Sequence, residues 1–180
     1  MSTLKLKQLT HYVCWKCEDP SKLGATKLNK VLWLADVLAY KISGVSITGS
    51  SYVKQQFGPV PRSILAVRRE LIAEKKIHER KDIIAGLLGV HFTALQKPDT
   101  SMFSPQELEI VDSVLSEICD KHTATSISEY SHDVVWQAAR IGEEIPMFAW
   151  LAGASGELSP EDFAWADSVI ESKEGMNDAA

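Results

Sequence analysis

Three cysteines and one nearby histidine are the residues of this 180-residue chain whose types suit metal binding or redox chemistry. Cys14 and Cys17 form a Cys-x-x-Cys pair, and His11 lies three residues before it. A structural zinc site needs two more ligands, usually a second such pair or two histidines at finger spacing. Only Cys119 remains, so the pattern favours reduced, buried helix cysteines over a small metal or redox enzyme that uses Cys14 and Cys17.

Asp36 is the only acidic residue in the apolar helix that the sequence predicts over 27–43. At about 100° per residue, Lys27, Lys30 and Lys41 share one arc, whereas Asp36 lies among apolar positions. An unpaired buried charge is costly, so we expect Asp36 to be ionised and paired. It either ties down nearby structure or organises a binding surface. The candidate partners are a backbone amide, Tyr52, His132 and Arg62.

The segment Gly58-Pro59-Val60-Pro61 follows a strand-like alternation over 52–57. Two prolines fix their own φ and restrict the residues before them, so we expect a stiff corner that ends the strand. The corner is either a constraint of the fold or a preorganised surface for a partner. We predict partner contacts here and on the neighbouring helix over 63–76. The predicted contact residues are Tyr52, Phe57, Gly58, Pro59, Val60 and Pro61.

His132 and Trp136 are four residues apart in a segment predicted as a helix, so they share one face. The sequence has no His-Glu-x-x-His motif and no nucleophile motif that would make His132 a catalytic base. We therefore expect a histidine that packs on an indole in the core, and we predict no catalytic residues and no metal ligands.

A basic stretch accompanies the predicted helix over 63–76 and the two strands predicted over 77–80 and 88–95. This helix–strand–strand order resembles the end of a winged helix and gives DNA-binding regulation as an alternative function. Glu70, Glu74 and Glu79 are interleaved, which is typical of a solvated charged face. The basic residues are Arg62, Arg68, Arg69, Lys75, Lys76, Arg80 and Lys81.

The composition is that of an ordinary globular protein, with 45% hydrophobic and 24% charged residues. The net charge of −5 makes the molecule as a whole a poor match for nucleic acid or an anionic membrane. No signal peptide is apparent, and the most apolar stretch, 31–40, is too short to span a bilayer. We expect a cytoplasmic protein without a cofactor.

Helical patterns dominate the chain and predict an α+β fold, mostly helical with a small antiparallel sheet or hairpin. Ser104, Pro105 and Glu107 form a capping box ahead of a helix that ends near 121. Ser126 and Glu129 form a second such pattern, before a helix ending near 140. Further helices are predicted over 4–17 and 159–172, with a frayed tail over 173–180.

Several of these residues together resemble the Panacea domain, the family of SocA-like antitoxins. Lys27 to Asp36 is similar to the family's "K-L-x-K-L-L-Y-F-A-D" helix, although Trp33 and Leu34 replace other aromatics. Ile47 to Pro61 resembles its "T-G-x-x-Y-x-x-x-x-x-G-P-V-P" segment. Phe103 to Leu108 resembles "F-S-x-x-E-L", and Ser131 to Trp136 resembles "S-H-x-x-x-x-W".

The resemblance implies a non-enzymatic protein that neutralises a small toxin by direct contact, or an adaptor that delivers the toxin to a protease. It implies a protein partner encoded by a neighbouring gene, whose identity does not carry over between members. We expect residues 1–150 to form the Panacea-like domain. Residues 151–180 would add a C-terminal helix and tail to the same unit.

Overall fold

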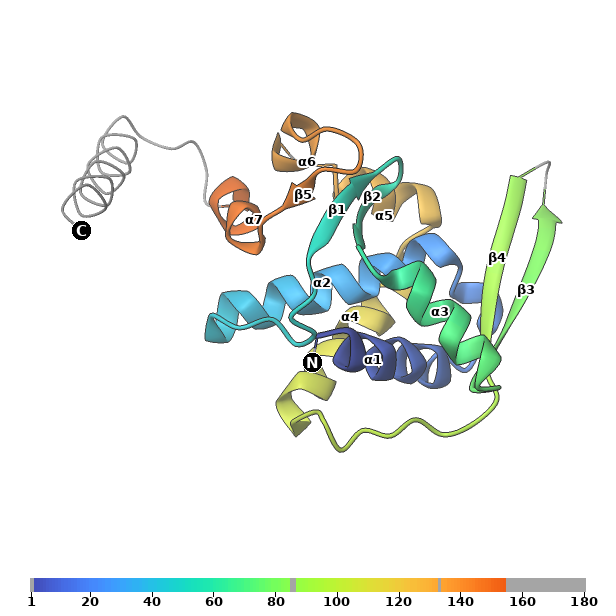
Figure 1. Ribbon diagram of the computed structural model, residues 1–180. Coiled ribbons are helices and arrows are strands. Elements are labelled where there is room, and N and C mark those ends of the chain that lie inside the picture. The colour runs from blue at the N-terminus through green and yellow to red at the C-terminus, as the bar shows by residue number, and fades with distance from the viewer. Residues whose placement is uncertain (1, 85–86, 133, 155–180) are drawn as a thin grey trace, which may run out of the picture.

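The computed structural model describes residues 2–84, 87–132 and 134–154 and confirms the α+β class, with helices dominant (Figure 1). The helix predicted over 159–172 and the tail after it lie outside the described residues. The helices are α1 (Ser2–Lys16), α2 (Ala25–Ser43), α3 (Ile64–Ala73), α4 (Pro105–Lys121), α5 (Ala124–Tyr130), α6 (Val134–Ala138) and α7 (Met147–Ala154), with the 3-10 helix η1 (Pro20–Lys22). The strands are β1 (Tyr52–Gln55), β2 (Gly58–Pro61), β3 (Ile77–Ile84), β4 (Leu87–Ala94) and β5 (Glu144–Ile145).

Helix α2 is the central element of the fold, as its broad apolar surface predicts. It contacts α1, α4, α5, α7, β2 and β4, so neighbours cover it on several sides (Figure 1). The helix ends at Gly44, which adopts a left-handed conformation with φ of 74° and donates its N–H to the carbonyl of Tyr40. This is the helix end that the glycine predicts.

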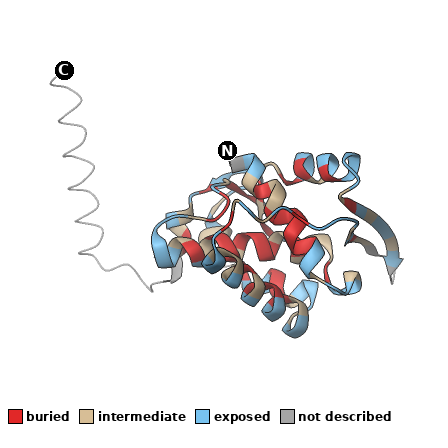
Figure 2. Ribbon diagram, turned by 90° about the horizontal axis from the view of Figure 1, so that it is seen from below, coloured by how far each residue is buried: buried red, intermediate tan, exposed pale blue. Residues whose placement is uncertain are grey.

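The main core lies between α1, α2, α3 and α4, whose apolar faces meet at fully buried side chains. The capping box of α4 is confirmed, since the Ser104 hydroxyl accepts from the Glu107 N–H at 3.1 Å. The Glu107 carboxylate in turn accepts from the Ser104 N–H at 2.7 Å. In Figure 2 the buried residues gather in these central helices, whereas the projecting β3–β4 hairpin is largely exposed or half-buried.

The expected break at Gly58–Pro61 is wrong, because these residues form strand β2. They pair antiparallel with β1, and a two-residue turn, Gln56-Phe57, joins the strands. The sheet order is β2-β1-β5, which places β2 at an edge. An edge strand pairs on one side only, so it tolerates prolines, which cannot donate a backbone hydrogen bond.

The helix predicted from Ser126 to about 140 is two helices, and its capping box is displaced. Thr123 caps α5, since its hydroxyl accepts from the Ser126 N–H at 3.1 Å. The Ser126 hydroxyl accepts from the Thr123 N–H at 3.0 Å. Ser126 is therefore the second residue of the box, the position predicted for Glu129. Helix α5 then ends at Tyr130, and α6 begins at Val134.

A second, aromatic core joins α7 and β5 to the rest of the molecule. It contains Trp33, Tyr52, Ile145 and Trp150, all at most 4% exposed. The indoles of Trp33 and Trp150 meet edge to face, with centroids 5.0 Å apart. No helix in the described part of the chain is long and apolar enough to cross a membrane.

Candidate functional site

Asp36 lies inside the protein, fully inaccessible to solvent, and its carboxylate receives hydrogen bonds from two other segments. The Thr48 N–H donates to Oδ1 at 2.8 Å, and the Thr48 hydroxyl donates to Oδ2. The Tyr52 hydroxyl also donates to Oδ2, at 2.8 Å. One carboxylate thereby ties the turn before β1, and β1 itself, to the middle of α2. The backbone amide and Tyr52 were among its predicted partners, whereas Arg62 pairs with Glu144 at 2.9 Å.

Burial and hydrogen bonding act on the Asp36 carboxyl in opposite directions. Burial raises the pKa of Asp36 above its usual value, and the bonds from Thr48 and Tyr52 lower it again without cancelling the rise. The pKa of Tyr52 is raised by burial and by the negative charge of Asp36. The single phenolic proton of Tyr52 has two acceptors, because the Leu32 carbonyl lies 2.9 Å from the same hydroxyl.

Lys30 is a second buried polar group on α2, with its side chain 1% exposed. Its Nζ donates to the hydroxyl of Ser131 at 2.5 Å, and that hydroxyl donates to the Ser128 carbonyl at 2.8 Å. Burial of the amine lowers the pKa of Lys30 to about 7, because the charged form loses its hydration. The amine therefore loses most of its charge just above neutral pH.

The Lys30 amine occupies the space beside Gly58 in β2. A Cβ added to Gly58 would lie 1.7 Å from Lys30 Nζ and 2.6 Å from the Ser131 hydroxyl. Gly58 also has φ of 108°, which side-chain-bearing residues rarely adopt. A side chain at this position would therefore have to displace the end of the Lys30 side chain and the Ser131 hydroxyl, in addition to straining its own backbone.

A lysine of lowered pKa beside a serine hydroxyl is the arrangement that Ser-Lys hydrolases use. Here Ser131 is fully buried, and its proton is engaged by a backbone carbonyl. A substrate carbonyl cannot reach an inaccessible hydroxyl, so we assign the pair to the architecture. The sequence placed Lys30 with Lys27 and Lys41 on one charged arc and so missed its burial.

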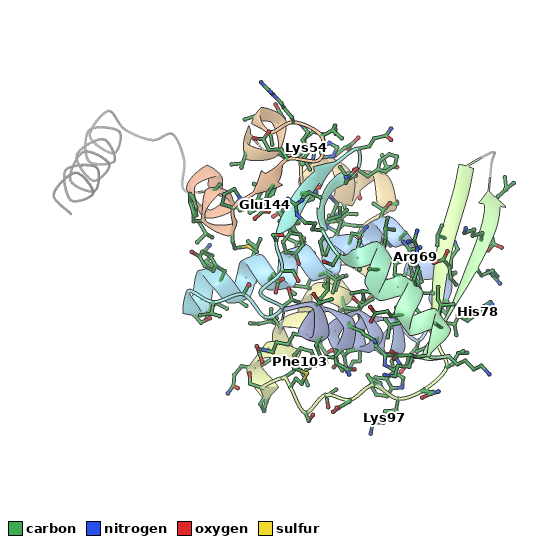
Figure 3. The ribbon with its side chains drawn as sticks, in the orientation of Figure 1. Lys54, Arg69, His78, Lys97, Phe103 and Glu144 are labelled. Carbon is green, nitrogen blue, oxygen red and sulfur yellow. The ribbon has the colours of Figure 1, made fainter. Side chains whose placement is uncertain are left out.

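His132 stacks on Trp136 with ring centroids 3.6 Å apart and planes 6° from parallel. His132 lies between α5 and α6, and its Nε2 is 3.3 Å from the Ser128 hydroxyl. On the other side, Lys54 Nζ lies 4.0 Å from the Trp136 ring centroid and donates to the Ala139 carbonyl at 2.9 Å. Lys54 of β1 thereby fastens the end of α6, near Glu144 of β5 (Figure 3). His132 thus packs on the Trp136 indole, as the sequence predicts.

The six predicted partner-contact residues divide into buried and accessible ones. Tyr52, Gly58, Pro59 and Pro61 are buried, Val60 is half-buried, and Phe57 is 59% exposed. The Ser128 hydroxyl donates to the Phe57 carbonyl at 3.1 Å and so anchors the turn. Phe57 is therefore an exposed aromatic ring on a fixed backbone, and it is the member of this set best placed to meet a partner.

A groove of about 890 Å³ lies next to Phe57, between η1, the start of α2, β4 and α5. Sequence patterns did not indicate it, because its walls come together only in the fold. Four basic or imidazole side chains line it, against the single carboxylate of Glu129. They are Lys22, Lys27, His91 and His122.

The Cys-x-x-Cys pair does not form a joint site. Cys14 is buried in the main core, while Cys17 lies half-buried beyond the end of α1. His11 is also buried and its Nε2 is 2.9 Å from the Gln96 carbonyl. Among the described residues, no three His, Cys, Asp or Glu side chains gather closely enough to hold a metal ion.

The basic stretch around α3 is partly neutralised by its own acids. Arg68 and Glu79 form a largely buried pair at 2.6 Å, and Arg68 lies over the Phe92 ring. Arg69 on α3 and His78 on β3 are labelled in Figure 3 on this side of the molecule. Further pairs here are Arg62–Glu144, Lys76–Glu74 and Arg80–Asp82. Paired cations have less charge to offer a phosphate backbone.

Helices packed around α2, the buried polar contacts of Asp36 and Lys30, and the β1–β2 hairpin together make up a mostly helical α+β domain. The family described as "Antitoxin SocA-like, Panacea domain" matches residues 28–137, and the chain belongs to this family. Searches of curated proteins and of solved structures found no match to the chain.

Replacing Asp36 by alanine is expected to destabilise the fold by about 3–5 kcal/mol, because three donors lose their buried acceptor. Chemical denaturation measures the loss. The matched control is Glu109→Ala on the exposed face of α4, with an expected change within about 0.5 kcal/mol. Equal midpoints for Asp36→Ala and the parent protein would contradict the assignment.

Lys30 is expected to make stability rise with pH. Its folded pKa of about 7 lies below the usual 10.5, so the unfolded chain binds the extra proton between these values. Stability then increases by up to about 1.4 kcal/mol per pH unit in this window, and falls as pH drops towards the folded pKa. The buried thiol of Cys14 and Tyr52 act oppositely at alkaline pH, because their pKa values are raised.

The measured quantity is therefore the difference in unfolding free energy between the parent and Lys30→Met, from about pH 6 to pH 9. Both proteins share the other titrating groups, so the difference isolates Lys30. A difference that stays flat with pH would show that Lys30 remains charged in the fold.

Gly58→Ala is expected to be far more destabilising than Gly142→Ala. Both glycines have positive φ, but a Cβ at Gly142 would meet nothing within 4 Å. Gly142→Ala should cost about 1–2 kcal/mol from backbone strain alone, and Gly58→Ala at least about 2 kcal/mol more, through displacement of Lys30. Thermal unfolding of the two variants measures the loss of stability in each. Equal losses would contradict the close contact between Gly58 and Lys30.

Proposed function

We propose that this chain neutralises a small protein toxin by direct contact, acting as a binding protein rather than an enzyme. The observation that carries the proposal is its membership of the SocA-like antitoxin family across residues 28–137. We place its action in the cytoplasm, which suits three free cysteines. The toxin would be the product of a neighbouring gene.

Burial supports a particular surface for this contact. Four residues in the family-like motifs make contacts within the fold and are not available to a partner. They are Asp36, Lys30, Gly58 and Ser131. A partner must use what remains accessible near them. Phe57 is exposed and rigidly held, and exposed aromatics on a fixed backbone bind with a small entropic cost.

The groove beside Phe57 extends this surface and indicates the chemistry of the partner. Its lining carries Lys27, two histidines and Lys22, which pairs with Asp120, against the single carboxylate of Glu129. A toxin segment that enters it would carry carboxylates together with an apolar residue that packs on Phe57. The predicted positions on α3 adjoin the other end of β2 and would extend the contact.

Phe57→Ala is expected to abolish rescue from the toxin while leaving thermal stability nearly unchanged. The matched control is Phe148→Ala, since Phe148 is 64% exposed on α7, compared with 59% for Phe57. Tyr52→Ala should lose rescue and stability together, because Tyr52 is buried and bonded to Asp36. The assay is growth of cells that express the toxin, paired with melting of each purified variant.

Full rescue by Phe57→Ala would place the interface elsewhere. Two mechanisms remain to be separated for a protein that does rescue. Direct neutralisation predicts a stoichiometric complex and an unchanged toxin lifetime. Delivery to a protease predicts a shortened toxin lifetime that depends on the protease, so pulse-chase measurement of the toxin distinguishes them.

A further inference from the structure

Two cysteines that are far apart in the sequence meet at the surface of the fold. Cys17 lies just after α1, and Cys119 lies in the last turn of α4. Both are half-buried and free, unlike Cys14, which is enclosed by the core. The Cys17 and Cys119 side chains are neighbours, since each is the largest influence on the pKa of the other.

The backbone around the two thiols holds them in this arrangement. Cys17 Sγ lies 3.2 Å from the Asp19 carbonyl, and Cys119 Sγ lies 3.7 Å from the Lys22 carbonyl. The loop from Cys17 to Lys22 therefore passes over the end of α4. The ion pair between Lys22 and Asp120, at 2.9 Å, fixes the same two segments together.

The two thiols differ in their electrostatic surroundings. The neighbouring Cys17 side chain lowers the pKa of Cys119, and the positive charges of Lys27 and Lys22 lower it further, against burial and the charge of Asp120. The pKa of Cys17 is raised by its interaction with Cys119 and by partial burial of the thiol. Cys119 is thus the better nucleophile at neutral pH, and Cys17 stands ready to resolve an adduct on it.

We propose that Cys17 and Cys119 are an oxidation site that forms a reversible intramolecular disulfide with small disulfide oxidants. The Cys119 thiolate attacks one sulfur of the oxidant, which forms a mixed disulfide and releases one small thiolate. Cys17 then loses its proton to solvent and attacks the Cys119 sulfur, which expels the second small thiol. Two protein thiols are oxidised, and one oxidant disulfide is reduced to two thiols.

The disulfide would restrain one wall of the groove beside Phe57. Lys22 and Lys27 line that groove, and they also contact the backbone or side chains beside Cys119. A covalent link between α4 and the Cys17–Lys22 loop would hold this wall in place. An effect on toxin affinity rests on the proposed function, whereas formation of the disulfide does not.

The test is to treat the reduced full-length protein with glutathione disulfide and to count free thiols after denaturation. We expect three thiols before treatment and one afterwards, with Cys17 joined to Cys119 in the peptide map and Cys14 free. Dithiothreitol should restore all three. The oxidised protein should melt at a higher temperature, because the link restricts the unfolded chain.

Variants assign the two roles. Cys17→Ser should stop at a glutathione adduct on Cys119, and Cys119→Ser should form neither this adduct nor the internal link. Cys14→Ser is the matched control and should still form it. Three thiols that survive the oxidant, a link that includes Cys14, or a link between two molecules would each overturn the proposal. These results are read without the toxin, so they are independent of whether the chain is an antitoxin.

Discussion

The carboxylate of Asp36 must obtain all its hydrogen bonds from the protein, because water does not reach it. Thr48 and Tyr52 supply them, and in doing so they fix where the chain returns to α2 after the loop that follows the helix. A purely apolar contact would bury this region equally well, yet it would tolerate small shifts. Directional bonds to a buried carboxyl group do not, since each lost bond leaves a desolvated partner.

Lys30 performs the same task at the other end of the hairpin. Asp36 holds Tyr52, where β1 begins, and Lys30 lies against Gly58, where β2 begins. Both groups belong to α2, so one helix determines the position of β1 and β2 at two points. The Phe57 turn lies next to the second point and is tied to α5 through Ser128. Its exposed ring is therefore presented by a backbone with little freedom.

Local sequence signals predicted α1 to α4, because caps and periodicity act over a few residues, but they merged α5 and α6 into one helix. Ser104 with Glu107, and Gly44 after the α2 helix, are examples in which side chain and backbone alone determine the outcome. The class of fold followed from them. Local signals gave the wrong result for Gly58–Pro61. Whether this segment breaks a strand or forms an edge strand depends on its pairing with β1.

The candidate site required the tertiary structure for the same reason. Periodicity identified Asp36 as buried, but it grouped Lys30 with exposed lysines, because a wheel cannot show which side neighbouring segments will cover. The contact between Cys17 and Cys119, and the groove beside Phe57, join residues that no local pattern relates.

The volume shared by Lys30, Gly58 and Ser131 has a consequence for how such a protein diverges. The three positions lie on different elements, but they fill one space, and a larger side chain at one needs a smaller side chain at another. Substitutions there should be strongly non-additive, since the cost of each depends on the occupants of the other two. Substitutions at these three positions are therefore expected to occur together, whereas residues of the exposed Phe57 turn can be replaced one at a time.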